Sequence, residues 1–350
     1  MNIRHLPSKL ILLFSSAGVA LLLIELAYRV FLFGPAAFSI RKVNSAHDIG
    51  ISGLIQPSPH QEIAYELKPN LDTIFKLVPF RTNSKGLRDR EIPVEKPPGV
   101  FRICVVGDSM TLPAGVAIED AWHKVLETRL NQRGSATPVE TVNFGVGGYY
   151  LRQYLGVIHE KAALYRPDLV IVAFCAQNDH WLPPGQLFDR PYRVLPKTHP
   201  FFESFALDTA RRIYSHLLRR FRGQATWVEK GTEERTAVAQ EQPATGVYTA
   251  AEESYLVTQF GRLASYSREA GVPVVVVNLF HQHNAAYSAE LDRLVRAAGL
   301  PFADVTSAFQ GTNVMRFRIY PTDNHPNAAG HAIFGETIER ALVGQKLIPE

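Results

Sequence analysis

Beyond residue 100 the chain alternates between short apolar runs and longer amphipathic segments. The apolar runs, which predict strands, are Phe101–Val106, Pro138–Asn143, Leu169–Cys175, Pro273–Leu279 and Phe302–Val305. The amphipathic segments, which predict helices, are Ala121–Gln132, Tyr149–Leu164, Ala250–Ala270, Glu290–Ala298 and Ala328–Val343. Strands that are apolar on both faces and alternate with helices are typical of a parallel sheet covered on both sides. We therefore expect an α/β fold with a three-layer, doubly wound parallel sheet.

The first 40 residues follow a different pattern. Leu10–Ile24 contains no charged residue, and the apolar character continues past Glu25 and Arg29. A membrane-spanning helix needs about 20 largely apolar residues, and these two charges are spaced to pair on one helix face or to snorkel toward an interface. A cleaved signal peptide is the alternative, although Gly34-Pro35-Ala36 is a poor cleavage site. We favour an N-terminal transmembrane helix that anchors the chain.

The remaining chain divides into a connector and a main domain. Residues 41–98 are rich in turn signals, with short strands expected around Thr73–Val78. Residues 99–350 form the main domain, which an insertion at about 180–249 interrupts. The insertion contains an amphipathic, arginine-rich helix and a polar stretch. It reads either as an ordinary solvated helix with a loop or as a lid or membrane-facing surface near the substrate.

Composition narrows the function classes. The chain has 350 residues, 46% of them hydrophobic, and a net charge of +4. It has no long Lys/Arg run, so nucleic acid is not an expected partner. The two cysteines, Cys104 and Cys175, lie in apolar runs and read as buried, unpaired thiols. His281 and His283 resemble half of a metal site without further ligands at useful spacing, so we expect no metal and no cofactor.

Four polar motifs each follow a predicted strand. They are Gly107-Asp108-Ser109-Met110-Thr111, Asn143-Phe144-Gly145-Val146-Gly147-Gly148, Gln177-Asn178-Asp179 and Asp323-Asn324-His325-Pro326-Asn327. In an open parallel α/β sheet, ligands bind at the carboxyl ends of the strands, so these segments converge on one edge. Together they supply a serine, a histidine, an aspartate, an amide and a glycine backbone, which is the inventory for acyl transfer through a serine nucleophile.

Each candidate residue has a chemical and a purely structural interpretation. Ser109 is a nucleophile at a strand-to-helix turn, near a helix N-terminus, or simply an N-cap. His325 is a general base or a surface residue, and Asp323 is placed to orient its imidazole. Asn178 can donate to an oxyanion and Gly148 can aim its N–H at substrate, or both are turn residues. The remaining late histidine, His331, reads as packing or surface.

The ordered set of Gly-Asp-Ser, Asn-x-x-x-x-Gly, Asn-Asp and a late Asp/His pair resembles the SGNH hydrolases, the superfamily of GDSL-type esterases and acylhydrolases. The flanks Thr82–Arg88 and Pro167–Val170 are similar to those of membrane-anchored bacterial members. The resemblance covers roughly residues 82–345 and implies a flavodoxin-like sheet. It departs in two places: Thr322 stands where Asp-x-x-His would need the aspartate, and Gln177 stands where many members have glycine.

Carried over residue by residue, the resemblance implies specific roles. Ser109 is the nucleophile, His325 the base and Asp323 its orienter. The backbone N–H groups of Ser109 and Gly148 and the amide of Asn178 form the oxyanion hole.

The expected function is hydrolysis of an ester through an acyl-enzyme, the substrate being a small molecule, an O-acylated envelope glycan or a lipid. The catalytic domain is expected on the extracytoplasmic, periplasmic side of a single-pass anchor. An O-acyltransferase that modifies an envelope polysaccharide and a non-catalytic glycan-binding protein are the alternatives. The sequence does not set the oligomeric state.

Overall fold

The computed structural model describes residues 6–176, 179–183, 186–189, 191–221 and 247–349. The chain folds into two compact units. The smaller comprises Met1–His47 and Thr198–Ala237, and the larger comprises Asp48–Lys197 and Val238–Glu350. All strands among the described residues belong to the larger unit.

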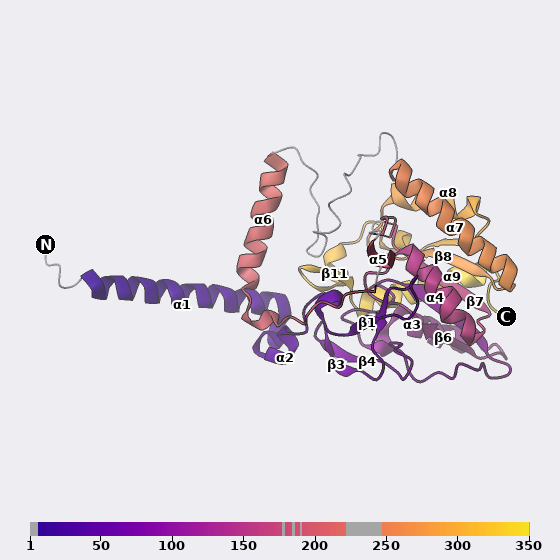
Figure 1. Ribbon diagram of the computed structural model, residues 1–350, viewed down its shortest axis with the longest axis horizontal. Helices are drawn as coiled ribbons and strands as arrows, with labels where there is room; N and C mark the ends of the chain where they lie inside the picture. The colour runs from indigo at the N-terminus through magenta and orange to yellow at the C-terminus, as the bar shows by residue number, and fades with distance from the viewer. Residues whose placement is uncertain (1–5, 177–178, 184–185, 190, 222–246, 350) are drawn as a thin grey trace. The chain divides into compact units, whose positions relative to one another are not determined.

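The centre of the larger unit is a five-stranded parallel sheet (Figure 1). Its strands, in spatial order, are β6 (Val139–Asn143), β5 (Phe101–Gly107), β7 (Leu169–Phe174), β8 (Val274–Asn278) and β9 (Phe302–Asp304). Numbered along the chain, this is the flavodoxin-like order 2-1-3-4-5. The strand order changes direction between β5 and β7, which are the first and third strands of this sheet along the chain. Sheets of this kind bind ligands at the carboxyl edge beside that point. The predicted fold class is confirmed.

Helices cover both faces of the sheet and complete the three layers. On one face lie α3 (Trp122–Gln132) and α9 (Ala328–Gly344), which also pack on each other. On the other lie α4 (Leu151–Glu160), α7 (Ala250–Ala270) and α8 (Ala285–Ala297). Alternate residues of β5 point to opposite layers because successive strand side chains face opposite sides. Among the described residues, both cysteines are buried and neither forms a disulfide, as their apolar surroundings predict.

Two helices differ from the sequence-based expectation. The segment expected to be one helix over Tyr149–Leu164 is broken at Lys161, and the short 3₁₀ helix η5 (Ala162–Tyr165) follows. The helix expected from Glu290 begins at Ala285, because the Asn284 side chain accepts hydrogen bonds from the first free backbone N–H groups. The propensity of the helical residues alone does not identify Asn284 as an N-cap, because the residues just before it are also polar.

Three small hairpins surround the sheet. In the connector, β1 (Ile55–Pro57) pairs with β2 (Tyr65–Leu67), and β3 (Asp72–Phe75) pairs with β4 (Val78–Arg81). The second of these contains the strands expected near Thr73–Val78. Late in the chain, β10 (Arg318–Tyr320) pairs with β11 (Asp323–Pro326). This last hairpin carries the late Asp/His motif.

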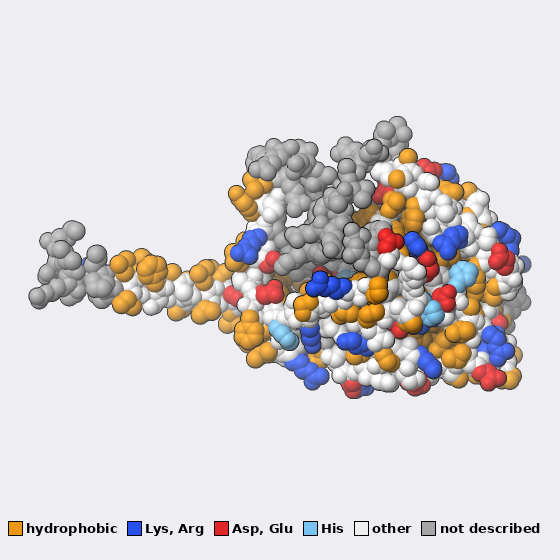
Figure 2. Space-filling model, viewed as in Figure 1, with side chains coloured by type: hydrophobic (Ala, Val, Ile, Leu, Met, Phe, Trp, Pro, Cys, Tyr) orange, Lys and Arg blue, Asp and Glu red, His pale blue; other side chains and the backbone are white. Residues whose placement is uncertain are grey.

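The described part of the smaller unit contains two helices of several turns, α1 (Leu6–Phe33) and α6 (Phe205–Phe221). The short elements η2 (Gly34–Phe38), α2 (Ile40–Val43) and η6 (Pro200–Phe202) also belong to it. Among the described residues, one helix, spanning Lys9–Phe38, is long and apolar enough to cross a membrane, which also fits a signal sequence. Figure 2 shows hydrophobic side chains along α1.

Candidate active site

Ser109 follows β5 at the carboxyl edge of the sheet and is half-buried. The helix N-terminus expected near Ser109 does not lie beside it: residues 108–116, the serine loop, are a series of turns, and α3 begins only at Trp122. The first turn is closed by the N–H groups of Thr111 and Leu112, which donate to the Asp108 carbonyl at 3.2 and 2.9 Å. The helix cannot form here because Pro113 lacks an N–H and Gly115 adopts a φ of 78°.

The side chains of two motif residues hold the serine loop. The Asp108 carboxylate accepts the N–H of Met110 at 2.9 Å, which is the turn-stabilising role that its position suggests. The Asn143 amide, at the end of β6, donates to the Thr111 carbonyl at 3.0 Å and accepts the N–H of Gly145 at 2.8 Å. The Gly-Asp-Ser and Asn-x-x-x-x-Gly motifs are thus joined by direct hydrogen bonds.

Arg88, from the connector, is the strongest support of the serine loop. Its buried guanidinium donates to the carbonyls of Leu112, Pro113 and Val116 at 2.8, 2.5 and 2.6 Å. The same group lies 4.6 Å from the centre of the Phe80 ring. Sequence reasoning assigned Arg88 no role, although it ends the Thr82–Arg88 flank that marked the family resemblance.

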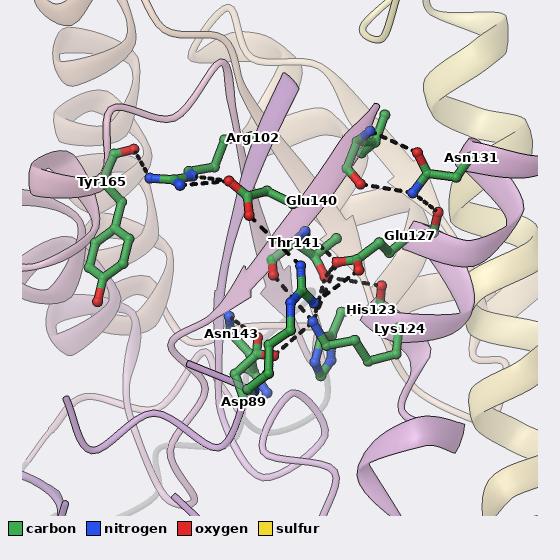
Figure 3. Close-up of polar contacts among 12 residues, drawn as sticks. Asp89, Arg102, His123, Lys124, Glu127, Asn131, Glu140, Thr141, Asn143 and Tyr165 are labelled. Atoms are coloured by element: carbon green, nitrogen blue, oxygen red, sulfur yellow. Dashed lines mark hydrogen bonds and ion pairs between the residues drawn. The ribbon is translucent and has the colours of Figure 1, made fainter. Parts of the chain in front are cut away.

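A buried polar network beside the serine loop ties the connector to β6 and α3 (Figure 3). The Asp89 carboxylate accepts the N–H of Asn143 at 3.2 Å and pairs with Lys124 Nζ at 2.7 Å. Burial raises the pKa of Asp89, and the Lys124 charge opposes that effect. Glu127 of α3 accepts the N–H and the hydroxyl of Thr141 at 2.6 and 2.8 Å. The network fixes Asn143, which in turn holds the serine loop.

His325 lies on β11, two residues after Asp323. Side chains two apart in a strand share one face, and the Asp323 carboxylate contacts both the Nδ1 of His325 and, at 3.0 Å, its backbone N–H. We assign the proton to Nδ1 because a carboxylate only accepts, which leaves Nε2 as an acceptor. The strand geometry explains why the spacing Asp-x-His serves here in place of Asp-x-x-His.

The Asp323 carboxylate has two further partners. Lys76 Nζ, in the turn between β3 and β4, lies 2.5 Å from Asp323 Oδ2, and its side chain is only 5% exposed. Tyr320 also bonds to Asp323, and burial together with that carboxylate raises the pKa of the tyrosine. Burial alone would raise the pKa of Asp323, but the His325 and Lys76 charges hold it well below its usual range. Asp323 therefore stays ionised at neutral pH.

The hairpin of β10 and β11, which carries His325, packs against the serine loop. A Cβ at Gly115 would lie 2.6 Å from Ile319 Cδ1 of β10, so the two segments are in close contact, and the φ of 78° favours glycine there. β10 is the partner strand of β11, with Tyr320 opposite Asp323. The described residues contain no hydrogen bond between Ser109 and His325, and their catalytic pairing stays a prediction.

Of the predicted oxyanion donors Gly148 and Asn178, the structure describes only Gly148. Gly148 is exposed and has a φ of 78°, which favours glycine, and a Cβ there would lie 3.0 Å from the Tyr65 hydroxyl. Asn178 and its neighbour Gln177 lie outside the described residues. The next residue, Asp179, is fixed by hydrogen bonds from the Tyr154 hydroxyl at 2.7 Å and the Cys175 N–H at 2.9 Å.

Three further histidines in the last part of the chain, His281, His283 and His331, pack against or contact other protein groups. His331 of α9 is buried and accepts the N–H of Trp122 at 3.2 Å, so its packing role is confirmed. Burial, with Arg318 and His325 nearby, lowers the pKa of His281 to about 4. His283 instead contacts the Thr306 hydroxyl at 3.0 Å. Within the described part of the chain, no three or more His, Cys, Asp or Glu side chains gather as metal ligands.

Part of the chain matches a known protein family. Residues 105–333 match the GDSL-like lipase/acylhydrolase family. No curated protein matches the chain. Among solved structures, TesA is 16% identical with a TM-score of 0.42, and the alignment covers 71% of this chain and 99% of TesA. A two-domain esterase active on acetylated mannans is also 16% identical, with a TM-score of 0.43, over 72% of this chain and 51% of its own.

An acetylxylan esterase from Geobacillus stearothermophilus is 12% identical, with a TM-score of 0.42, over 69% of this chain and 94% of its own. The family match covers well over half of the chain and includes Ser109, Gly148, Asn178, Asp323 and His325. The chain belongs to the GDSL-like lipase/acylhydrolase family, and it is an enzyme that acts on ester bonds.

Proposed function

We propose that the protein hydrolyses its ester through an acyl-enzyme on Ser109. The observation that carries the proposal is the buried Asp323 carboxylate, which orients His325 on a hairpin packed against the serine loop. Nε2 of His325 would take the hydroxyl proton of Ser109 as Oγ attacks the carbonyl carbon, and would pass that proton to the leaving alcohol. Water would then attack the acyl carbon and lose a proton to His325, which would return that proton to Ser109 Oγ as the bond between Oγ and the acyl group breaks and the acid leaves.

The same proposal assigns the oxyanion donors. The negative charge that develops on the carbonyl oxygen would be met by the N–H groups of Ser109 and Gly148 and by the Asn178 amide. Gly148 supports this role because it is exposed and its backbone adopts a conformation that presents the N–H without a side chain. No cofactor or metal enters the mechanism.

We further propose that α1 anchors the enzyme in a membrane with the catalytic unit on the extracytoplasmic side. The support is the length and apolar character of the helix over Lys9–Phe38. An anchored enzyme would meet acylated glycans or lipids of the envelope, which is the substrate class that we favour.

Two measurements test the nucleophile. Full-length protein in lipid nanodiscs should be labelled by a fluorophosphonate, and Ser109→Ala should not be labelled. Ser109→Ala and His325→Ala should each lose at least about 10³-fold in kcat on an acyl-ester panel, with unchanged thermal unfolding. Wild-type turnover by either variant would reject the assignment.

A third measurement separates hydrolysis from transfer, which share the acyl-Ser109 intermediate. An acetyl ester is supplied with and without an oligosaccharide acceptor, and the products are followed by mass. We expect release of acetate in both arms. Negligible release alone, with acetylated sugar forming only when acceptor is present, would establish an O-acyltransferase instead.

The anchor has its own test. Membranes that contain the full chain are washed with high salt and carbonate, and the N-terminal sequence of the retained protein is determined. We expect the intact N-terminus in the membrane fraction. A soluble form that lacks about the first 36 residues would show a cleaved signal peptide.

A further inference from the structure

Glu25 and Arg29 of α1 hold the start of α6. Glu25 Oε1 accepts the N–H of Phe205 at 3.0 Å, and Oε2 accepts the N–H of Ala206 at 3.1 Å and the hydroxyl of Ser204 at 2.8 Å. These are the free donors of a helix N-terminus, where a carboxylate is also favoured by the helix dipole. Glu25 therefore caps a helix that lies about 180 residues away along the chain.

Arg29 completes this junction. It pairs with Glu25 at 2.7 Å, as their spacing predicts, and donates to the carbonyls of Phe201 and Glu203 at 2.6 and 2.8 Å. Its guanidinium lies 5.4 Å from the centre of the Phe205 ring. The Tyr28 hydroxyl adds a bond of 2.9 Å to Thr209 of α6. The two charges thus have protein partners, which permits them to end an apolar helix without facing lipid.

The junction sits at a defined depth along α1. The helical residues that precede Glu25, Leu6 to Ile24, span about 28 Å at 1.5 Å per residue. This matches the thickness of the hydrocarbon core of a bilayer, about 30 Å. If α1 crosses the membrane, Glu25 and Arg29 lie where it leaves the core. Within the smaller unit, α6 begins beside this end of α1 and extends away from it (Figure 1), as a helix lying along the bilayer surface would.

α6 presents an exposed apolar surface. Leu207, Ile213, Tyr214 and Leu217 are between 45% and 64% exposed. At roughly 100° per residue these four positions fall within an arc of about 120°, away from the side of Phe205 and Thr209 that contacts α1. Figure 2 shows hydrophobic side chains on this helix. Ordinary solvated helices do not place several large apolar residues together on an open face.

The charge of α6 complements an anionic surface. Its sequence holds four arginines, at 211, 212, 219 and 220, against one acidic residue, Asp208. A helix that combines an exposed apolar arc with arginines is suited to lie in the headgroup region of a membrane that contains anionic lipids. We propose that α6 is an interfacial helix that binds the anionic surface of the same bilayer that α1 crosses. This inference rests on the proposed membrane anchor.

The test places one label on each side of α6. Leu217→Cys lies on the apolar arc, and Ser215→Cys, two residues away, lies on the far side and is the matched control. Both are made in the full chain, labelled with an environment-sensitive fluorophore and reconstituted in liposomes of phosphatidylglycerol and phosphatidylcholine. Wild-type protein controls for the native thiols Cys104 and Cys175, which are buried. Brominated acyl chains in the lipid then report contact with the membrane by quenching.

We expect strong quenching and a blue-shifted emission at position 217, neither of them at 215, and weaker quenching at 217 in pure phosphatidylcholine. Equal quenching in both lipids would overturn the anionic preference. A label at 217 that stays in water, or that is shielded without quenching, would overturn the interfacial helix while flotation with the liposomes still supports the anchor. Failure to float would instead reject the anchor, and the inference with it.

Discussion

Lys76 Nζ lies 2.5 Å from Asp323 Oδ2, so a cation from the β3–β4 turn shares the carboxylate that orients His325. Both side chains are at most 10% exposed, and the pair is therefore poorly screened by solvent. The Asp323 carboxylate contacts both the Lys76 ammonium group and the His325 imidazole. Lys76 is a positioning residue in this arrangement, because it acts on His325 only through Asp323.

Replacement of Lys76 by methionine should move the pH profile of the enzyme. Without the ammonium group, the Asp323 carboxylate keeps its contact with His325 but no longer pairs with Lys76. The loss of a nearby positive charge makes the protonated imidazole more stable. We expect the acid limb of kcat/KM to shift upward by about 1 pH unit. Lys76→Arg keeps the charge and should retain the wild-type limb. A Lys76→Met profile that superimposes on wild type would show that the lysine serves stability alone.

Asn178→Ala should lower kcat by about 10²–10³-fold, because loss of one oxyanion donor has that typical cost. Gln177→Ala removes an amide of similar chemistry from the adjacent position in the sequence and should act mainly on KM. Steady-state kinetics on one acyl ester compares the two. If Asn178→Ala changes KM alone, its amide contacts the substrate without stabilising the transition state.

Arg88→Met should lower the free energy of unfolding by roughly 3 kcal/mol, since three buried carbonyls of the serine loop lose a charged donor. Urea unfolding of the full chain measures the loss, and kcat should fall with it. Arg90→Met is the control: this neighbouring arginine is 47% exposed, and such ion pairs contribute about 1 kcal/mol or less. Equal losses in the two variants would contradict the role of Arg88.

Stability should fall as the pH drops below about 6.5, the ordinary histidine value. Burial lowers the pKa of His331 to about 3 and that of His281 to about 4. The unfolded chain therefore binds protons that the folded chain excludes, so this contribution is complete above pH 6.5 and is lost toward pH 3 to 4. Each such histidine adds a slope of about 1.4 kcal/mol per pH unit.

His331→Asn tests that slope. Its side-chain oxygen can replace Nδ1 as the acceptor for Trp122, but it does not titrate. Urea unfolding between pH 7 and pH 4.5 should give a slope that is shallower by about one histidine. His159→Asn, at an exposed position, should retain the wild-type slope. A wild-type slope in His331→Asn would exclude this histidine as the source.

The sheet was predictable because its strands are apolar on both faces. β7 and β8 have no exposed residue. Short, continuously apolar runs of this kind are typical of strands that are buried on both faces of a parallel sheet. The contact between Asp323 and His325 was predictable because the two residues lie two positions apart in one motif. The helix N-terminus expected beside Ser109 was wrong because tertiary contacts and Pro113 shape the serine loop as turns instead.

Lys76 and Arg88 could not be predicted because their partners lie far away in the sequence. Lys76 meets a carboxylate 247 positions later, from a hairpin turn in which its own φ is 45°. No local pattern encodes such a contact, and a lysine in a polar connector is ordinarily solvated. Glu25 and Arg29 are a similar case, since their pairing was visible but their binding to α6 was not.

The connector sets a limit on how far the enzyme can be shortened. The family match begins at residue 105, yet Lys76, Arg88 and Asp89 precede it and contact Asp323, the serine loop and Asn143. A truncated form that starts at the family boundary would keep every motif residue while discarding the groups that hold them. The smallest active fragment should therefore begin near Asp48, where the larger unit starts, and domain swaps between relatives should exchange the connector together with the sheet.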